Sequence, residues 1–170
     1  MSSGLAAFTL FHVALSLVGI FSGFFVAFGL VKAKRLDGWT VLFLTTTVLT
    51  SVTGFLFPVH QFMPSHVVGI ISLVVLAIAI WARYRGHLVG AWRRTYAITA
   101  MIALYLNVFV LIVQLFSKIP ALKSLAPTQT EAPFKITQLV VLVIFIVLTV
   151  IAAKRFHPER PQGNDGSIQS

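Results

Sequence analysis

The chain contains no cysteine among its 170 residues and only four acidic side chains. Without a thiol it can form no disulfide, offer no thiolate ligand to a metal and use no cysteine nucleophile. The four acids, Asp37, Glu131, Glu159 and Asp165, all lie outside the long apolar runs. This excludes proton carriers and proteases that depend on a carboxylate inside the membrane. The H-E-x-x-H, G-x-S-x-G and P-loop patterns are also absent, so the sequence favours a protein that is not an enzyme.

Charge of either sign is scarce, at 10% of residues, while 58% of residues are hydrophobic. Soluble domains have about 25% charged and about 45–50% apolar residues, so the composition indicates a membrane protein with the lipid bilayer as its surroundings. The net charge of +9 comes from short basic clusters between apolar runs. That arrangement is typical of membrane topology signals, and we expect no nucleic-acid partner.

Five apolar runs contain no Asp, Glu, Lys or Arg, and a membrane-spanning helix needs about 20 such residues. We therefore predict an all-α membrane protein, a bundle of about five transmembrane helices. The expected spans are residues 5–31, 39–57, 65–82, 96–116 and 136–153. Residues 1–156 form a single transmembrane domain in this interpretation. Residues 157–170 have the polar composition of a disordered tail.

Positive charge is distributed unequally between the two sides of this predicted bundle. Cytoplasmic loops retain Lys and Arg, so the side with more of them is assigned to the cytoplasm. The N-terminus is then outside and the C-terminus and tail are cytoplasmic, with the first span as an uncleaved anchor. We expect a multi-pass protein of a cell membrane, with the outline typical of bacterial inner-membrane proteins. Ten basic residues lie on one side and three on the other: Lys32, Lys34, Arg35, Arg83, Arg85, Arg93, Arg94, Lys154, Arg155 and Arg160, against Lys118, Lys123 and Lys135.

Two predicted spans carry a face that differs from the rest of the helix. In the first span, Gly19 and Gly23 form a G-x-x-x-G pattern, which predicts close packing on a neighbouring helix. That neighbour could belong to this chain, to a second copy or to another subunit of a membrane complex. In the fourth span, Asn107 and Gln114 share one stripe, which we expect to face the bundle interior. Their amides would serve either as interhelical hydrogen bonds or as contacts to a neutral polar head group such as a quinone.

Three of the five histidines, His12, His60 and His66, fall in the predicted outer half. Imidazole is a common ligand of zinc, copper and haem iron, and helical bundles place such ligands on facing helices. His12 and His66 are thus candidate ligands for one b-type haem, and all three are candidates for a metal ion. The difference in their depths, about 10 Å at 1.5 Å per residue, counts against the pair. The alternative is that no cofactor binds and His12 hydrogen-bonds to a nearby backbone or hydroxyl group such as that of Ser16.

The segment from residue 118 to residue 135 is the longest connection outside the predicted spans. It contains Pro120, Pro127 and Pro133. Loops of this length are usually functional or disordered. Both a stiffened lid over the outer end of the bundle and a plain spacer remain open.

Three functions stay open at this point. The leading hypothesis is a non-catalytic subunit or accessory protein, supported by the G-x-x-x-G face and by the absence of acid and thiol chemistry in the spans. The alternative is a redox or metal-handling protein with one haem or metal ion at the outer face. The third is a small-molecule permease, which is less favoured because the spans offer few groups to bind a polar substrate.

Overall fold

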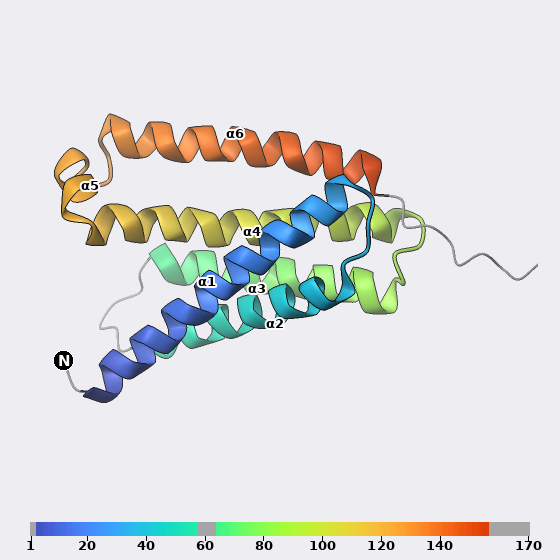
Figure 1. Ribbon diagram of the computed structural model, residues 1–170, viewed down its shortest axis with the longest axis horizontal. Helices are drawn as coiled ribbons and strands as arrows, with labels where there is room; N and C mark the ends of the chain where they lie inside the picture. Colours follow the sequence, from blue (N-terminus) through green and yellow to red (C-terminus); the bar gives the residue numbers. More distant parts are fainter. Residues whose placement is uncertain (1–2, 58–63, 157–170) are drawn as a thin grey trace, which may run out of the picture.

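The computed structural model describes residues 3–57 and 64–156, and these stretches are helical with no strand. The predicted all-α fold is therefore confirmed. The long helices run along the long axis of the molecule (Figure 1). Each apolar run became a helix a few residues longer or shorter than expected, and the third continues into a short π-helix. The elements are α1 Ser3–Val31, α2 Asp37–Gly54, α3 Pro64–Ile80, η1 Trp81–Arg85, α4 Ala91–Lys118, α5 Pro120–Leu125 and α6 Ala132–Arg155.

Four helices in the described part of the chain are long and apolar enough to cross a membrane: Ser3–Val31, His66–Arg85, Ala91–Lys118 and Ala132–Arg155. The remaining long helix, α2, has 18 residues and carries six threonines, which lower its hydropathy. It nevertheless packs along α1 and α3. Length and composition thus allow four helices to span a membrane, and a fifth span depends on how α2 is placed.

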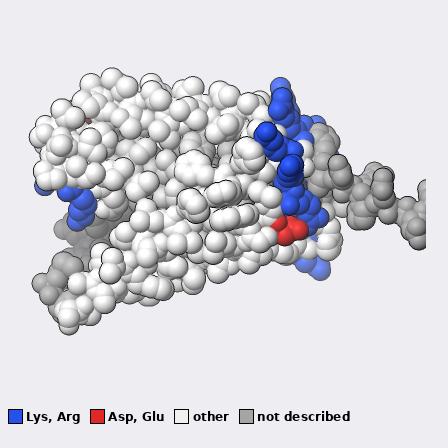
Figure 2. Space-filling model, viewed as in Figure 1, with Lys and Arg blue, Asp and Glu red and all other residues white. Residues whose placement is uncertain are grey.

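Basic residues gather where α1, η1 and α6 end and where α4 begins, at the right of Figures 1 and 2. We call this the basic end. The end that carries α5 and the N-terminus is called the opposite end. The described basic side chains at the basic end are Lys32, Lys34, Arg35, Arg83, Arg85, Arg93, Arg94, Lys154 and Arg155.

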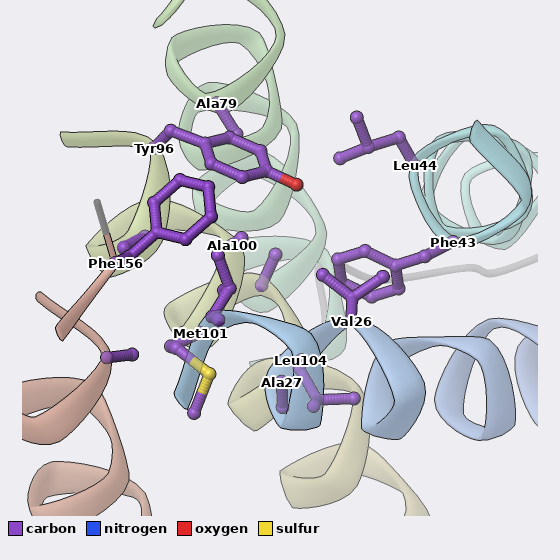
Figure 3. Close-up of a cluster of buried hydrophobic side chains, with 14 of the residues drawn as sticks. Val26, Ala27, Phe43, Leu44, Ala79, Tyr96, Ala100, Met101, Leu104 and Phe156 are labelled. Carbon is purple, nitrogen blue, oxygen red and sulfur yellow. The ribbon is translucent and has the colours of Figure 1, made fainter. Parts of the chain in front are cut away.

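The largest cluster of buried side chains lies around α4, towards the basic end (Figure 3). Small residues of α4, such as Ala100 and Ala103, are almost fully buried. They let neighbouring helices approach closely, which is how helices associate where lipid is as apolar as the side chains. Phe43 of α2 and Leu76 of α3 complete the cluster from the other helices.

The last long helix, α6, lies at the periphery of the bundle. Val140, Val143 and Val147 are each about half exposed, at 52%, 51% and 51% of their surface. α6 packs mainly on α4 (Figure 1). Its opposite face is therefore available to lipid or to another protein.

The glycine face of α1 packs within the chain. A Cβ atom on Gly23 would lie 2.5 Å from Leu104 Cδ1 of α4 and 2.9 Å from the Phe43 ring of α2. A Cβ atom on Gly19 would lie 3.2 Å and 3.3 Å from the hydroxyl oxygens of Thr46 and Thr47. The predicted close packing is present, but α2 and α4 occupy this face. A second chain would have to use a different surface.

The segment after α4 folds back onto the end of that helix. Gln129 Nε2 donates hydrogen bonds to the Val113 carbonyl at 3.0 Å and to Ser117 Oγ at 2.7 Å. Ala126 is buried against Ile112 and Phe116. The segment also contains the short helix α5, which the sequence pattern did not predict. Residues 118–135 therefore cover the opposite end of α4.

The connection into α6 has its own polar contacts. Glu131 accepts a hydrogen bond from the Thr128 hydroxyl at 2.8 Å and further bonds from the backbone N–H groups of Thr128 and Thr130. Desolvation opposes ionisation, but these hydrogen bonds prevail and lower the pKa of the Glu131 carboxyl. The ionised carboxylate therefore stabilises the turn that begins α6.

Candidate functional sites

His12 of α1 is bonded to the end of α2. Its Nδ1 atom lies 2.8 Å from Thr53 Oγ1. Thr53 Oγ1 also lies 2.7 Å from the Leu49 carbonyl, to which its hydroxyl can donate. Both bonds form together when His12 Nδ1 carries the ring hydrogen and donates it to Thr53. In the neutral ring the lone pair is then on Nε2. The expected neighbour Ser16 instead donates to the Val13 carbonyl in its own helix.

His66 lies in the first turn of α3, and its ring is 5.7 Å from that of Phe55, between centroids. The His12 ring meets Phe57 edge-on at 5.1 Å. The two histidines thus approach the C-terminal end of α2 from two different helices. His60, the third candidate ligand, lies outside the described residues. Within those residues, no group of three or more His, Cys, Asp or Glu side chains gathers as a metal site would.

Asn107 and Gln114, which the helical pattern placed on one stripe, have different surroundings. Asn107 Nδ2 donates to Thr47 Oγ1 at 3.1 Å, so it joins α4 to α2 close to Gly19. Gln114 is exposed. The stripe faces the interior at Tyr96 and turns outward nearer the opposite end, because α1 crosses α4 and then diverges from it (Figure 1). The prediction of an inward orientation is therefore wrong for Gln114.

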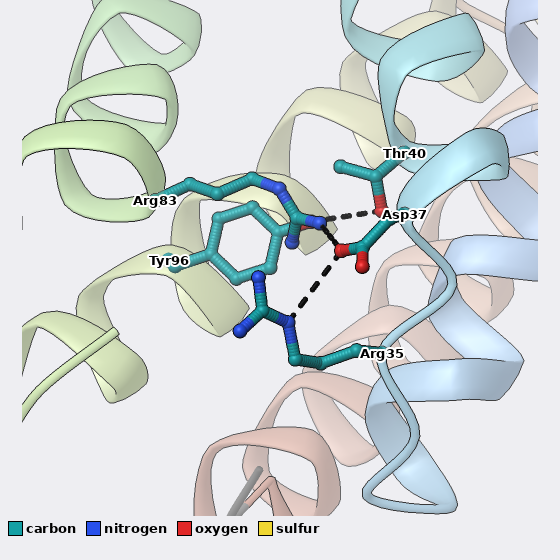
Figure 4. A network of polar contacts seen from close by, with 5 residues as sticks. All are labelled: Arg35, Asp37, Thr40, Arg83 and Tyr96. Atoms are coloured by element: carbon teal, nitrogen blue, oxygen red, sulfur yellow. Dashed lines mark hydrogen bonds and ion pairs between the residues drawn. The ribbon is translucent and has the colours of Figure 1, made fainter. Parts of the chain in front are cut away.

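A network at the basic end was not predicted as a site (Figure 4). The Arg83 side chain is only 4% exposed and donates to the Asp37 carboxylate. Its guanidinium also lies 5.2 Å from the centroid of the Tyr96 ring. Arg35 Nε lies 3.5 Å from the same Asp37 oxygen. The network joins the start of α2 to η1 and to α4.

Two further contacts position this network. The Tyr96 hydroxyl donates to Thr40 Oγ1 at 3.4 Å, which orients the ring that Arg83 faces. The π-helical turn is closed by a hydrogen bond from the Gly86 N–H to the Trp81 carbonyl at 2.9 Å. Wide turns of this kind are rare and re-aim side chains relative to a regular α-helix. Arg83, in the middle of that turn, points inward.

Sequence reasoning treated Arg83 as one of several cytoplasmic charges. One signal could have drawn attention to it. Asp37 is an isolated acid beside a strongly basic cluster, and a buried arginine needs a carboxylate partner. No sequence pattern indicated that Arg83 points inward, because its orientation depends on the π-helical backbone that follows α3.

Comparison with known proteins gives no further constraint, since no protein-family model, curated protein or solved structure matches the chain. Its function must be argued from the contacts described above.

Proposed function

We propose that all five long helices cross a cell membrane, with the N-terminus outside and the basic end in the cytoplasm. The contacts of α2 support this arrangement. Asp37 at its start is paired with Arg83 at the end of the third span, and Thr53 near its end is bonded to His12 of the first span. Because α2 contacts one span at its first residue and another near its last, it extends over the same membrane depth as these two spans. The excess of basic residues at one end supports the orientation.

The threonines of α2 are compatible with a membrane-crossing helix because several of their hydroxyl groups are already hydrogen-bonded within the helix. Thr46 and Thr53 donate to carbonyls four residues earlier, at 2.7 Å each. Hydroxyls in membrane helices commonly bond back in this way. The desolvation cost of α2 is therefore smaller than its hydropathy suggests.

For the activity, we propose a non-catalytic subunit or accessory protein of a membrane complex. The observation that supports it is that polar side chains in the spans are used to join helices of the same chain. Asn107 bonds to Thr47, and Ser51 donates to Ser72 at 3.2 Å between α2 and α3. The broad apolar face of α6 is one surface that remains for a partner.

Gentle purification followed by light scattering and absorption spectroscopy tests this proposal. We expect a protein mass above that of one 18.6 kDa chain, in a stoichiometric complex with itself or another subunit. We also expect no stoichiometric haem or metal. A monomer that retains a stoichiometric cofactor would contradict the proposal.

A second candidate function is a redox or metal-handling protein. It is favoured by the contact of His12 Nδ1 with Thr53 Oγ1 at 2.8 Å, which leaves Nε2 as the ring nitrogen that could bind a ligand. Ligating histidines are typically oriented by such a hydrogen bond on the other ring nitrogen. A haem absorption band or bound metal that is lost in His12→Ala and His66→Ala but kept in Ser16→Ala would support this candidate. Equal spectra in all three variants would contradict it.

A further inference from the structure

A small pocket at the basic end combines three cations with an apolar wall. Lys34, Arg35 and Arg83 line one part of it, together with Tyr96. Leu30 and Phe156 are among the apolar residues that line the rest. The cations come from the connection after α1 and from η1, so the pocket exists only in the folded bundle.

Among the residues that the structure describes, the positive charges at this pocket outnumber the negative ones. Asp37 is the sole acidic residue at the basic end among those the structure describes. Both Arg35 and Arg83 approach its Oδ1 atom, and Lys34 has no carboxylate of its own there. Two positive charges are therefore in excess. Arg83 is buried, so its charge is screened less by water than those of the exposed Lys34 and Arg35, and a second anion at these two side chains would be attracted by all three cations.

The arginine in the middle of the pocket is held in place before any ligand arrives. Arg83 is bonded to Asp37, and its guanidinium lies 5.2 Å and 5.8 Å from the Tyr96 and Tyr84 ring centroids. Figure 4 shows the Arg83 guanidinium beside the Tyr96 ring and the Asp37 carboxylate. Because its side chain is only 4% exposed and bonded to Asp37, Arg83 acts as a fixed positive charge behind the exposed Lys34 and Arg35.

We propose that a phosphate group binds at the mouth of this pocket, on the exposed side chains of Lys34 and Arg35, with the positive charge of Arg83 beneath them. The pocket itself, of about 10 Å³, is too small to enclose a phosphate. The apolar wall and the position at the end of the spans favour the headgroup of an anionic phospholipid as the source, because basic pockets between membrane helices bind such headgroups. Free phosphate is the other source with the same chemistry. This inference does not depend on whether the protein is a subunit of a complex.

Native mass spectrometry of the full-length protein in mild detergent tests the proposal. Equal amounts of phosphatidylglycerol and phosphatidylcholine are added, and the lipid retained by each variant is compared. We expect preferential retention of one phosphatidylglycerol. Lys34→Gln and Arg35→Gln should each lower its affinity about fivefold, the effect of one basic residue near an anionic surface.

The matched controls are Lys32→Gln and Arg94→Gln, which remove one positive charge at the same end but do not line the pocket. They should retain phosphatidylglycerol as the unmodified protein does. Arg83→Gln is avoided because loss of the buried arginine leaves Asp37 without its partner and threatens folding.

A second measurement separates the two sources. Thermal unfolding is followed with sodium phosphate and with sodium chloride at equal ionic strength. Stabilisation by phosphate that is lost in Lys34→Gln and Arg35→Gln, without lipid preference, would support the pocket with free phosphate as its ligand. Equal lipid retention and equal phosphate response in pocket and control variants would overturn the proposal.

Discussion

Gly23 and Gly38 are both helical glycines, but only Gly23 is enclosed by other side chains. A Cβ atom on Gly23 would meet Leu104 and Phe43 closer than normal contact, whereas one on Gly38 would meet nothing within 4 Å. The same chemical change should therefore have opposite effects at the two positions. This pair isolates the effect of packing from that of backbone freedom.

Gly23→Ala should destabilise the protein by about 1–3 kcal/mol, the usual cost of an extra methyl group in a packed interior. Gly38→Ala should be neutral or stabilise by up to about 1 kcal/mol, because alanine restricts the unfolded chain of a helical position. Thermal unfolding in detergent measures both. If the two variants unfolded at the same temperature, α1 would not pack on α2 and α4 as described.

At the scale of single elements, α2 is the helix that polar contacts hold most firmly. It is bonded to α1 through Thr53, to α3 through Ser51 and to α4 through Thr47. Asn107 supplies the last of these bonds from α4, while Gln114 on the same helix is exposed. The two amides therefore provide a matched comparison.

Asn107→Ala should lower the free energy of unfolding by about 0.6 kcal/mol, the average value of an interhelical hydrogen bond in a membrane protein. Gln114→Ala should leave it unchanged, because an exposed amide loses no partner within the chain. Unfolding in mixed micelles of increasing dodecyl sulfate content measures the difference. A larger effect at Gln114 would mean that a ligand or a partner protein binds that amide.

The helices could be predicted from the sequence because a long apolar run is a local property. The fourth run, residues 96–116, becomes Ala91–Lys118 since the helix continues beyond the apolar stretch through Arg93 and Arg94. α5 was not predicted, because its six residues have no apolar run of their own. Its contacts with the end of α4 exist only after the chain has folded back.

The candidate sites were predictable only in part, and for a related reason. A step of 100° per residue predicted that Asn107 faces a neighbour, because its environment is set by nearby turns of α4. The same step failed at Gln114, since the divergence of α1 from α4 is a property of the assembled bundle. The pairing of His12 with Thr53 and of Arg83 with Asp37 joins residues far apart in the chain, which no local pattern encodes.

At the scale of the whole molecule, the distribution of charge defines two unlike ends. The absence of cysteine makes their placement testable with single cysteines at exposed positions. We expect Leu56→Cys and Ser124→Cys to react with a membrane-impermeant maleimide in intact cells. Lys34→Cys and Val89→Cys should react only after the membrane is broken.

The position of α2 decides the interpretation of this experiment. If α2 did not cross, Lys34 and Leu56 would lie on the same side of the membrane and would share one labelling pattern. If the whole orientation were reversed, all four positions would exchange their patterns. A non-crossing α2 and a reversed orientation therefore give different labelling patterns. A detergent-treated sample gives the full extent of labelling for each variant.

The ion pair between Asp37 and Arg83 also bears on how the protein is made. Asp37 leaves the ribosome well before Arg83, so the start of α2 has no buried counter-charge until the third helix has been synthesised. Because α2 is not among the described helices that are long and apolar enough to cross a membrane by themselves, we expect its attachment to the membrane before that moment to depend on its packing against α1. If α2 crosses the membrane as we propose, its integration is completed by the arrival of the third helix. A nascent chain that stops before Arg83 should then release α2 from the bilayer more readily than one that includes it.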